Sequence, residues 1–148
     1  MDILNVATIV CIGLLIGAEL AVSVFINPVV WKLDPAAQAT AFRLFGRRLG
    51  GAMPVWYIGS LLLLVWETVT HRHEPHVGLL GIAIALWAGA IALSLMSLVP
   101  INNRMVRADA DGFTESTRRE LRKWEGLHRV RVAVLAAAMI FFMVGIGI

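Results

Sequence analysis

The chain has 148 residues, of which 59% are hydrophobic, and its mean hydropathy is +0.79. A small soluble domain leaves much of its surface in water and cannot bury this much apolar surface, whereas a lipid bilayer can. The net charge is +3. Because the basic residues flank apolar runs and form no separate patch, we expect them to orient the chain in a membrane, and we expect no nucleic-acid partner.

Four apolar segments have about the length that a helix needs to cross a bilayer core of ~30 Å. We expect one domain over residues 1–148, with spans at about residues 3–31, 53–70, 77–99 and 132–148. Proline removes a backbone N–H and crowds the preceding turn, so Asn27-Pro28 should end the first span and Pro100 the third. The sequence therefore predicts an all-α integral membrane four-helix bundle.

The first apolar run holds the single cysteine, Cys11. One thiol cannot form an internal disulfide or a CxxC pair, which excludes thiol oxidoreductases that use paired cysteines. We expect Cys11 to be a small packing residue. The run has no basic region before it and no small-residue cleavage pattern after it, so we expect it to remain as a helix.

A short amphipathic helix is expected between the first two spans. Asp34 is a plausible N-cap with Pro35 at the first helical position, and Gly50-Gly51 should end the helix. The helix would lie along the membrane interface with its arginines among the lipid headgroups. Its apolar side would carry Phe42, Phe45 and Leu49, and its basic side Arg43, Arg47 and Arg48.

Two further segments carry local signals. Trp56, Tyr57 and Trp66 lie near the ends of the second span, as in the aromatic belts of membrane interfaces. After an acidic turn at residues 109–112, residues 115–131 read as a charged helix that continues into the fourth span. Thr114 or Ser116 should cap this helix.

Lysine and arginine are distributed very unequally among the loops. The first and third loops, which four spans place on the same side, carry twelve of these residues, and the second loop carries only Arg72. By the positive-inside rule we expect the two basic loops to be cytoplasmic and both termini outside, in a bacterial-type inner membrane. The twelve are Lys32, Arg43, Arg47, Arg48, Arg104, Arg107, Arg118, Arg119, Arg122, Lys123, Arg129 and Arg131.

Polar residues gather at the expected cytoplasmic end of the bundle. Polar groups inside a membrane cost several kcal/mol unless they are paired, so their position is informative about function. Trp124, His128 and Arg131 share one helix face at spacing i, i+4, i+7. We expect a pocket between the helices at this end. Its expected members are Glu19, Asn27, Asn102, Asn103, Trp124, His128 and Arg131.

Each of these residues has a simpler alternative role. Glu19 could form a structural ion pair with Arg129 or Arg131, or it could accept or hold a proton. His128 could cap a neighbouring group or act as a general base or acid. Asparagines 102 and 103 could terminate a helix or orient a substrate carbonyl or phenol. Glu125 and Arg129, spaced i, i+4, should form an ordinary helix pair.

The second loop contains three histidines and a carboxylate within six residues: His71, His73, Glu74 and His76. Such a set could bind copper or zinc. The turn is short and has no visible supporting groups, so we expect adventitious binding and no physiological metal site. Haem ligation through His128 is an open alternative.

The final motif resembles a known family. Pro100-Ile101-Asn102-Asn103, followed about twenty residues later by Trp124-Glu125-x-x-His128-Arg129-x-Arg131, is similar to the anthrone oxygenase-like family of small four-helix membrane proteins. That family's pattern is a proline and asparagines at the end of the third span, then a tryptophan, then His and Arg at the start of the fourth. In segment order the resemblance covers most of the chain.

The resemblance implies oxidation of a polyketide anthrone to an anthraquinone by O2, with no metal, flavin or other cofactor. It implies that His128, aided by Glu19, takes a proton, and that Arg131 or the asparagines stabilise the oxyanion. Trp124 would stack on the substrate. The catalytic candidates are thus His128, Glu19 and Arg131, and the substrate-binding candidates are Asn27, Asn102, Asn103, Trp124 and Arg129.

Three functions are compatible with these features. The first is a membrane-embedded oxygenase or oxidoreductase acting on a hydrophobic aromatic substrate, anthrone- or quinol-like, that arrives from the bilayer. The second is a non-enzymatic membrane protein that binds a lipid or quinone-like ligand or scaffolds a partner. The third is a metal- or haem-dependent protein. Membrane lipids are expected partners, and the small residues from Gly81 to Ala90 favour a homo-oligomer.

Overall fold

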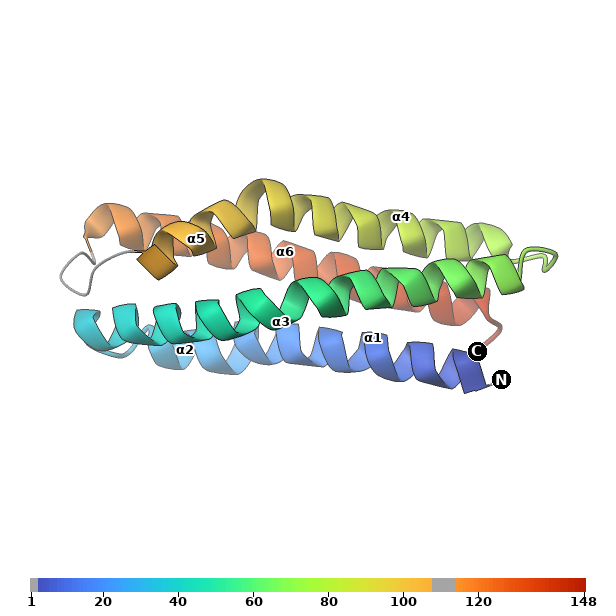
Figure 1. Cartoon of the computed structure of the whole chain (residues 1–148), viewed down its shortest axis with the longest axis horizontal. Coiled ribbons are helices and arrows are strands. Elements are labelled where there is room, and N and C mark those ends of the chain that lie inside the picture. The colour runs from blue at the N-terminus through green and yellow to red at the C-terminus, as the bar shows by residue number, and fades with distance from the viewer. Residues whose placement is uncertain (1–2, 108–113) are drawn as a thin grey trace.

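The protein folds into a bundle of four helical rods. The structure is a computed structural model and describes residues 3–107 and 114–148. Figure 1 shows the rods side by side along the long axis, with both termini at one end. α2 meets α3 at the opposite end, where α5 also ends and α6 begins. In chain order the elements are α1 (Ile3–Ala21), η1 (Val22–Ile26), α2 (Asn27–Val30), α3 (Pro35–Thr70), α4 (Val77–Leu93), η2 (Ser94–Leu98), α5 (Val99–Arg107) and α6 (Glu115–Gly145).

Within the described ranges, four helices are long and apolar enough to cross a membrane. Their outward faces carry large apolar side chains such as Leu14, Leu62 and Met96, which are more than half exposed. Such faces suit lipid and do not suit water. The prediction of an all-α integral membrane bundle is confirmed. The four helices are Ile3–Val30, Pro35–Thr70, Val77–Arg107 and Glu115–Gly145.

The first and third rods continue past their prolines, so the prediction that Pro28 and Pro100 end these spans is wrong. The helices run on to Val30 and Arg107. In each rod a π-helical turn, with i→i+5 hydrogen bonds, ends two residues before the proline: η1 before Pro28 and η2 before Pro100. A proline ring crowds the carbonyl four residues back and offers no N–H. The wider turn takes up this misfit without ending the helix.

The second rod, α3, is one helix of 36 residues. The Asp34 carboxylate accepts hydrogen bonds from the backbone N–H groups of Ala36 and Ala37, at 3.1 and 3.0 Å, which confirms the predicted cap. The stop predicted at Gly50-Gly51 is wrong, because the amphipathic segment continues without a break into the span. A helical glycine costs about 1 kcal/mol relative to alanine. Here Gly50 faces α5, and the packing described below offsets that cost.

The fourth rod, α6, confirms the predicted continuous helix from the charged segment into the apolar one. Its N-cap is Thr114, whose hydroxyl accepts a hydrogen bond from the Thr117 N–H at 3.4 Å. The acidic turn predicted at residues 109–112 lies outside the described residues.

Two apolar clusters fill the bundle at different depths. The larger one occupies the half nearer the termini, where Trp87, Leu135 and Phe142 are fully buried. The smaller one lies towards the other end and is formed by Ile101, Met105 and Leu121, packed against Trp31, Phe42 and Trp124. Between the two clusters the packing opens into a cavity, and the polar side chains of the next section surround it.

Candidate functional site

A cavity of about 240 Å³ lies in the half of the bundle that is away from the termini. All four rods contribute to its wall, which is mostly apolar. Ligand pockets of membrane and soluble bundles have this character: apolar walls with a few convergent polar groups. The polar side chains that line it are Glu19, Asn27, Tyr57, Ser94, Asn102, Trp124, His128 and Arg131.

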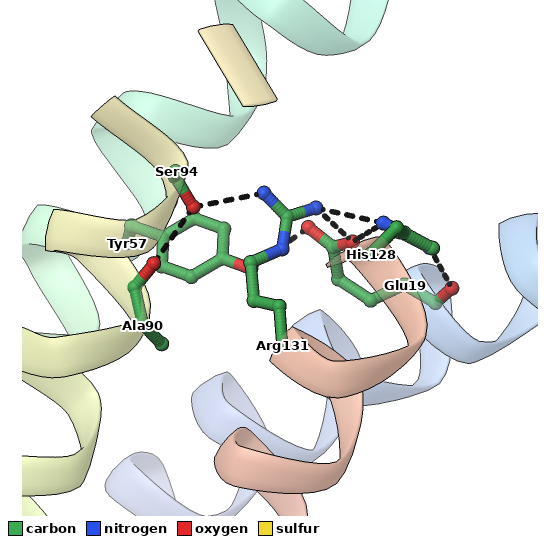
Figure 2. A network of polar contacts seen from close by, with 6 residues as sticks. All are labelled: Glu19, Tyr57, Ala90, Ser94, His128 and Arg131. Carbon is green, nitrogen blue, oxygen red and sulfur yellow. Dashed lines mark hydrogen bonds and ion pairs between the residues drawn. The ribbon is translucent and has the colours of Figure 1, made fainter. Parts of the chain in front are cut away.

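Glu19 is 3% exposed and is the centre of the polar cluster. Its Oε1 accepts a hydrogen bond from the Tyr57 hydroxyl at 2.9 Å, and its Oε2 accepts one from Arg131 Nη2 at 2.6 Å. His128 Nδ1 lies 3.3 Å from the same Oε2 (Figure 2). A carboxylate at this depth is tolerated only with such partners. Of the two ion pairs expected for Glu19, the structure forms the one with Arg131.

Arg131, on the fourth rod, contacts each of the other three rods through its guanidinium. Nη1 donates to Ser94 Oγ at 3.0 Å, while Nη2 lies between Glu19 and His128 Nδ1, at 3.0 Å from the latter. The guanidinium also lies 5.4 Å from the centroid of the Tyr57 ring, in cation–π geometry. Its Nε is buried and has no hydrogen-bond partner among the described residues. The arginine is therefore fixed on one side and retains an unused donor.

His128 is held by both of its ring nitrogens. Nε2 lies 3.1 Å from the backbone carbonyl oxygen of Glu19, and because a carbonyl only accepts, Nε2 must carry the hydrogen. In the neutral ring Nδ1 is then an acceptor, and it faces Arg131 Nη2. Trp124 stacks on the ring at 4.9 Å between centroids and 9° between planes. The ring is thus fixed in position and tautomer, and in this arrangement it offers no free nitrogen to a haem iron.

Two of the predicted asparagines, Asn27 and Asn102, also line the cavity. Asn27 is 4% exposed, and its amide nitrogen has no hydrogen-bond partner. Asn102 lies against α3 at two glycines: a Cβ atom at Gly46 would be 3.0 Å from its Oδ1, and one at Gly50 would be 3.3 Å from its Nδ2. Side-chain bulk at these glycines would displace Asn102. The glycines thus allow α5 to approach α3 closely enough to place an amide in the wall.

Two other predicted residues are not brought to the cavity. Asn103 is exposed on α5 and does not line the cavity. Arg129 is also exposed, and its Nη2 pairs with Glu125 Oε1 at 2.7 Å, which confirms the expected helix pair. Glu125 in turn accepts a hydrogen bond from Trp31 Nε1 at 3.0 Å, so this pair joins the end of the first rod to α6.

Tyr57 and Ser94 are the members of the site that the sequence analysis missed. Tyr57 was expected in the interfacial belt, but it is 6% exposed and in the interior, because α3 begins eighteen residues before the expected span. Its backbone carbonyl also accepts a hydrogen bond from Trp87 Nε1 at 3.1 Å. A signal was present: Tyr57, Ser60 and Glu67 recur at helical spacing and are all buried, so they mark an inward polar stripe.

The histidines of the second loop form no cluster. Among residues 3–107 and 114–148, no group of three or more His, Cys, Asp or Glu side chains is placed to hold a metal ion. His71 Nδ1 lies 2.9 Å from the backbone oxygen of Glu67, and His73 Nε2 accepts a hydrogen bond from Arg72 Nε at 3.0 Å. These rings serve local contacts of the turn.

Comparison with known proteins agrees with the motif. A family model described as anthrone oxygenase matches residues 40–141, which is most of the chain. The match includes Tyr57, His128 and Arg131 but not Glu19 or Asn27. No curated protein and no solved structure shows significant similarity to the chain. The resemblance inferred from the final motif is confirmed, and the chain belongs to the anthrone oxygenase family.

Proposed function

We propose that the protein is a membrane-embedded oxygenase that oxidises a hydrophobic aromatic substrate, of the anthrone or quinol type, with O2. The supporting observation is the apolar cavity whose polar wall carries the buried Glu19, His128 and Arg131 in mutual contact. An apolar aromatic molecule would enter from the bilayer and meet proton-accepting and cationic groups together. The family assignment supports the same reaction class.

The chemistry needs a base and an oxyanion site. An anthrone loses a proton from its methylene carbon, and the negative charge is delocalised onto the ring oxygen. The electron-rich anion transfers electrons to O2 and forms a C–O bond, which gives a hydroperoxide once a proton is returned. Loss of water from this group leaves a second carbonyl. One oxygen atom of O2 enters the quinone and the other leaves as water, so O2 is the sole oxidant.

Glu19 and His128 are the proposed proton-accepting unit. Their reactive atoms, Oε2 and Nδ1, are 3.3 Å apart, so a proton taken by either could be shared with the other. His128 Nε2 is bound to a backbone carbonyl, and Arg131 lies against Nδ1. The ring is therefore best placed to hold and orient the carboxylate and to share its proton. Arg131 and Asn102, which both line the cavity, would stabilise the anionic oxygen.

We also propose that this end of the bundle faces the cytoplasm. The support is the distribution of lysine and arginine: eleven lie towards this end of the bundle, apart from Arg131 at the cavity, and Arg72 alone lies at the other end. Both termini would then be outside.

Oxygen consumption by the purified protein in detergent, with anthrone as substrate, tests the proposal. We expect His128→Ala to lower turnover by about 10²–10⁴-fold, the usual contribution of a positioned acid or base. Lys123→Ala, an exposed position on the same helix, is the matched control. Anthrone with no protein gives the uncatalysed rate. Turnover that is unchanged in His128→Ala would refute the proposed unit, and wild-type protein with no rate above the blank would refute the activity.

A second function is favoured by one observation. Both carboxylate oxygens of Glu19 have donors, as a purely structural ion pair would have. On this alternative the protein binds a lipid or quinone-like molecule without transforming it. His128→Ala and Glu19→Gln would then change thermal stability or ligand affinity, and the wild type would consume no oxygen.

A further inference from the structure

We propose that Asn27 forms a second ligand-binding position in the cavity, where its amide N–H donates a hydrogen bond to a ligand oxygen at the edge opposite the Glu19–Arg131 pair. This inference rests on the proposed function only in assuming an aromatic ligand in the cavity. Binding is measured without O2, so the inference about Asn27 and the proposed oxygenase function can fail separately.

The first support is the state of the amide itself. Asn27 is 4% exposed and lines the cavity, yet its Nδ2 has no hydrogen-bond partner. More than nine in ten buried polar groups have a partner, so this donor requires an explanation. Nδ2 is itself buried, and because Asn27 lines the cavity a rotation of its side chain would bring this donor to a ligand acceptor. No hydrogen bond made by Nδ2 to the described residues opposes that rotation.

A second buried side chain in the same region has a paired amide nitrogen, although its amide oxygen has no partner among the described residues. Gln38 is 1% exposed, and its Nε2 donates to the backbone oxygens of Trp31 and Leu33, both at 3.0 Å. Gln38 therefore fixes the connection between the first two rods, and it does not line the cavity. Asn27 makes no such bond through its amide nitrogen, which argues against a structural role for that atom.

The spacing of the two polar positions limits the ligand. Glu19 and Asn27 are eight residues apart on one rod, which is about 12 Å at 1.5 Å per residue. The donor at the Glu19 end is Arg131, because a carboxylate only accepts. Two hydrogen bonds of about 2.9 Å each, one from Arg131 and one from Asn27, leave at most about 6 Å between two ligand oxygens, since the wide turn η1 shortens the rod. A fused-ring ketone or quinone with oxygens on opposite edges has that span. A hydrocarbon of the same shape would fill the cavity without using either position.

Anaerobic binding of a matched pair of probes tests the inference. The probes are 2-methyl-1,4-naphthoquinone and 2-methylnaphthalene, which share a ring system and differ in the two oxygens, and calorimetry on purified protein in detergent gives both affinities. We expect the wild type to prefer the quinone. Asn27→Leu, which keeps the branching of the side chain, should reduce that preference by about three- to tenfold, the value of one neutral hydrogen bond. Its affinity for the hydrocarbon should not fall.

Thermal unfolding of the same proteins supplies an independent readout. Asn27→Leu should match or exceed the wild type in Tm, because an apolar side chain replaces a buried donor with no partner. Gln38→Met, the control, should lower Tm because two hydrogen bonds are lost. Equal affinity of the wild type for both probes, an unchanged preference in Asn27→Leu, or a clear fall in its Tm would each overturn the inference. Oxygen consumption that is absent while the quinone preference is present would refute the proposed function alone.

Discussion

Arg131 Nη2 and Glu19 Oε2, 112 residues apart in sequence, lie 2.6 Å apart inside the bundle. This contact joins the first rod to the last, at side-chain exposures of 11% and 3%. When one partner of a buried pair is removed, the other is left as an uncompensated charge, whereas removal of both leaves none. Single and double substitutions at Glu19 and Arg131 therefore test whether this ion pair stabilises the polar cluster.

The first prediction concerns this pair. Arg131→Met should lower the free energy of unfolding by about 3–5 kcal/mol. The double variant Glu19→Gln/Arg131→Met should be clearly more stable than Arg131→Met alone, because the orphaned carboxylate is gone. Thermal unfolding in detergent of the wild type, both single variants and the double variant measures the coupling. Effects that simply add would show that the two side chains do not interact as described.

The second prediction concerns Tyr57. Tyr57→Phe removes the donor to Glu19 Oε1 but keeps the ring beside Arg131, so it should cost about 1.5–3 kcal/mol, as for a hydrogen bond to a charged group. Tyr57→Leu also removes the aromatic face and should cost more. The Tm values of the two variants are the measurement. A Tyr57→Phe protein as stable as the wild type would contradict the hydrogen bond.

The third prediction separates two neighbouring asparagines. Asn102 lines the cavity and Asn103 faces outward, although the sequence motif treats them alike. Asn102→Ala should lower oxygen turnover by tenfold or more, as expected for an oxyanion donor, and Asn103→Ala should have little effect. The two variants are each other's control in the anthrone assay. Equal losses would contradict the placement of α5.

The fourth prediction concerns the contact between α3 and α5. A Cβ at Gly46 would lie 2.9 Å from Val106 Cγ2 and 3.0 Å from Asn102 Oδ1, so Gly46→Ala should push α5 away, lower Tm and reduce turnover. At Gly51 the added carbon would meet no described atom within 4 Å apart from its chain neighbours and the nearby backbone of its own helix. Gly51→Ala should therefore be neutral or stabilising by up to about 1 kcal/mol. A Gly46→Ala protein that behaves like Gly51→Ala would refute the close approach.

The fifth prediction is the orientation in the membrane. In a Cys11→Ser background, a cysteine is placed at Glu74 in the second loop or at Ser116 in the first turn of α6, both exposed positions. A membrane-impermeant maleimide applied to intact cells should label Glu74→Cys and should label Ser116→Cys only after lysis. The reverse pattern would invert the proposed topology.

The sequence was sufficient for the parts of the fold that depend on local signals. Asp34 and Thr114 cap their helices as expected, because a side-chain acceptor beside free N–H groups is a local feature. The alignment of Trp124, His128 and Arg131 followed from helical spacing alone. The final motif indicated the family, which the family model confirms.

Other parts depended on contacts between rods and could not be read locally. The continuation past Gly50-Gly51 depends on α5 packing against α3, so propensity alone gave a stop. The choice between Asn102 and Asn103 depends on the rotation of α5, which a π-helical turn sets. The hydrogen bond from Tyr57 to Glu19 could be recognised only once α3 was known to begin at Pro35.

The two π-helical turns have a consequence for helical phase. Glu19 and Asn27 are separated by eight positions, as are Ser94 and Asn102, and all four line the cavity. On a regular helix, positions eight apart differ by about 80° in direction, and positions seven apart by about 20°. Each wide turn absorbs one extra residue, so both pairs behave as if seven apart and face the same way. Loss of one residue within η1 or η2 would keep the pair in phase but would leave the proline in a regular helix, whereas gain of one would rotate Asn27 or Asn102 out of the wall. The wide turns therefore accommodate the prolines and also bring polar residues eight positions apart onto the cavity side of each rod.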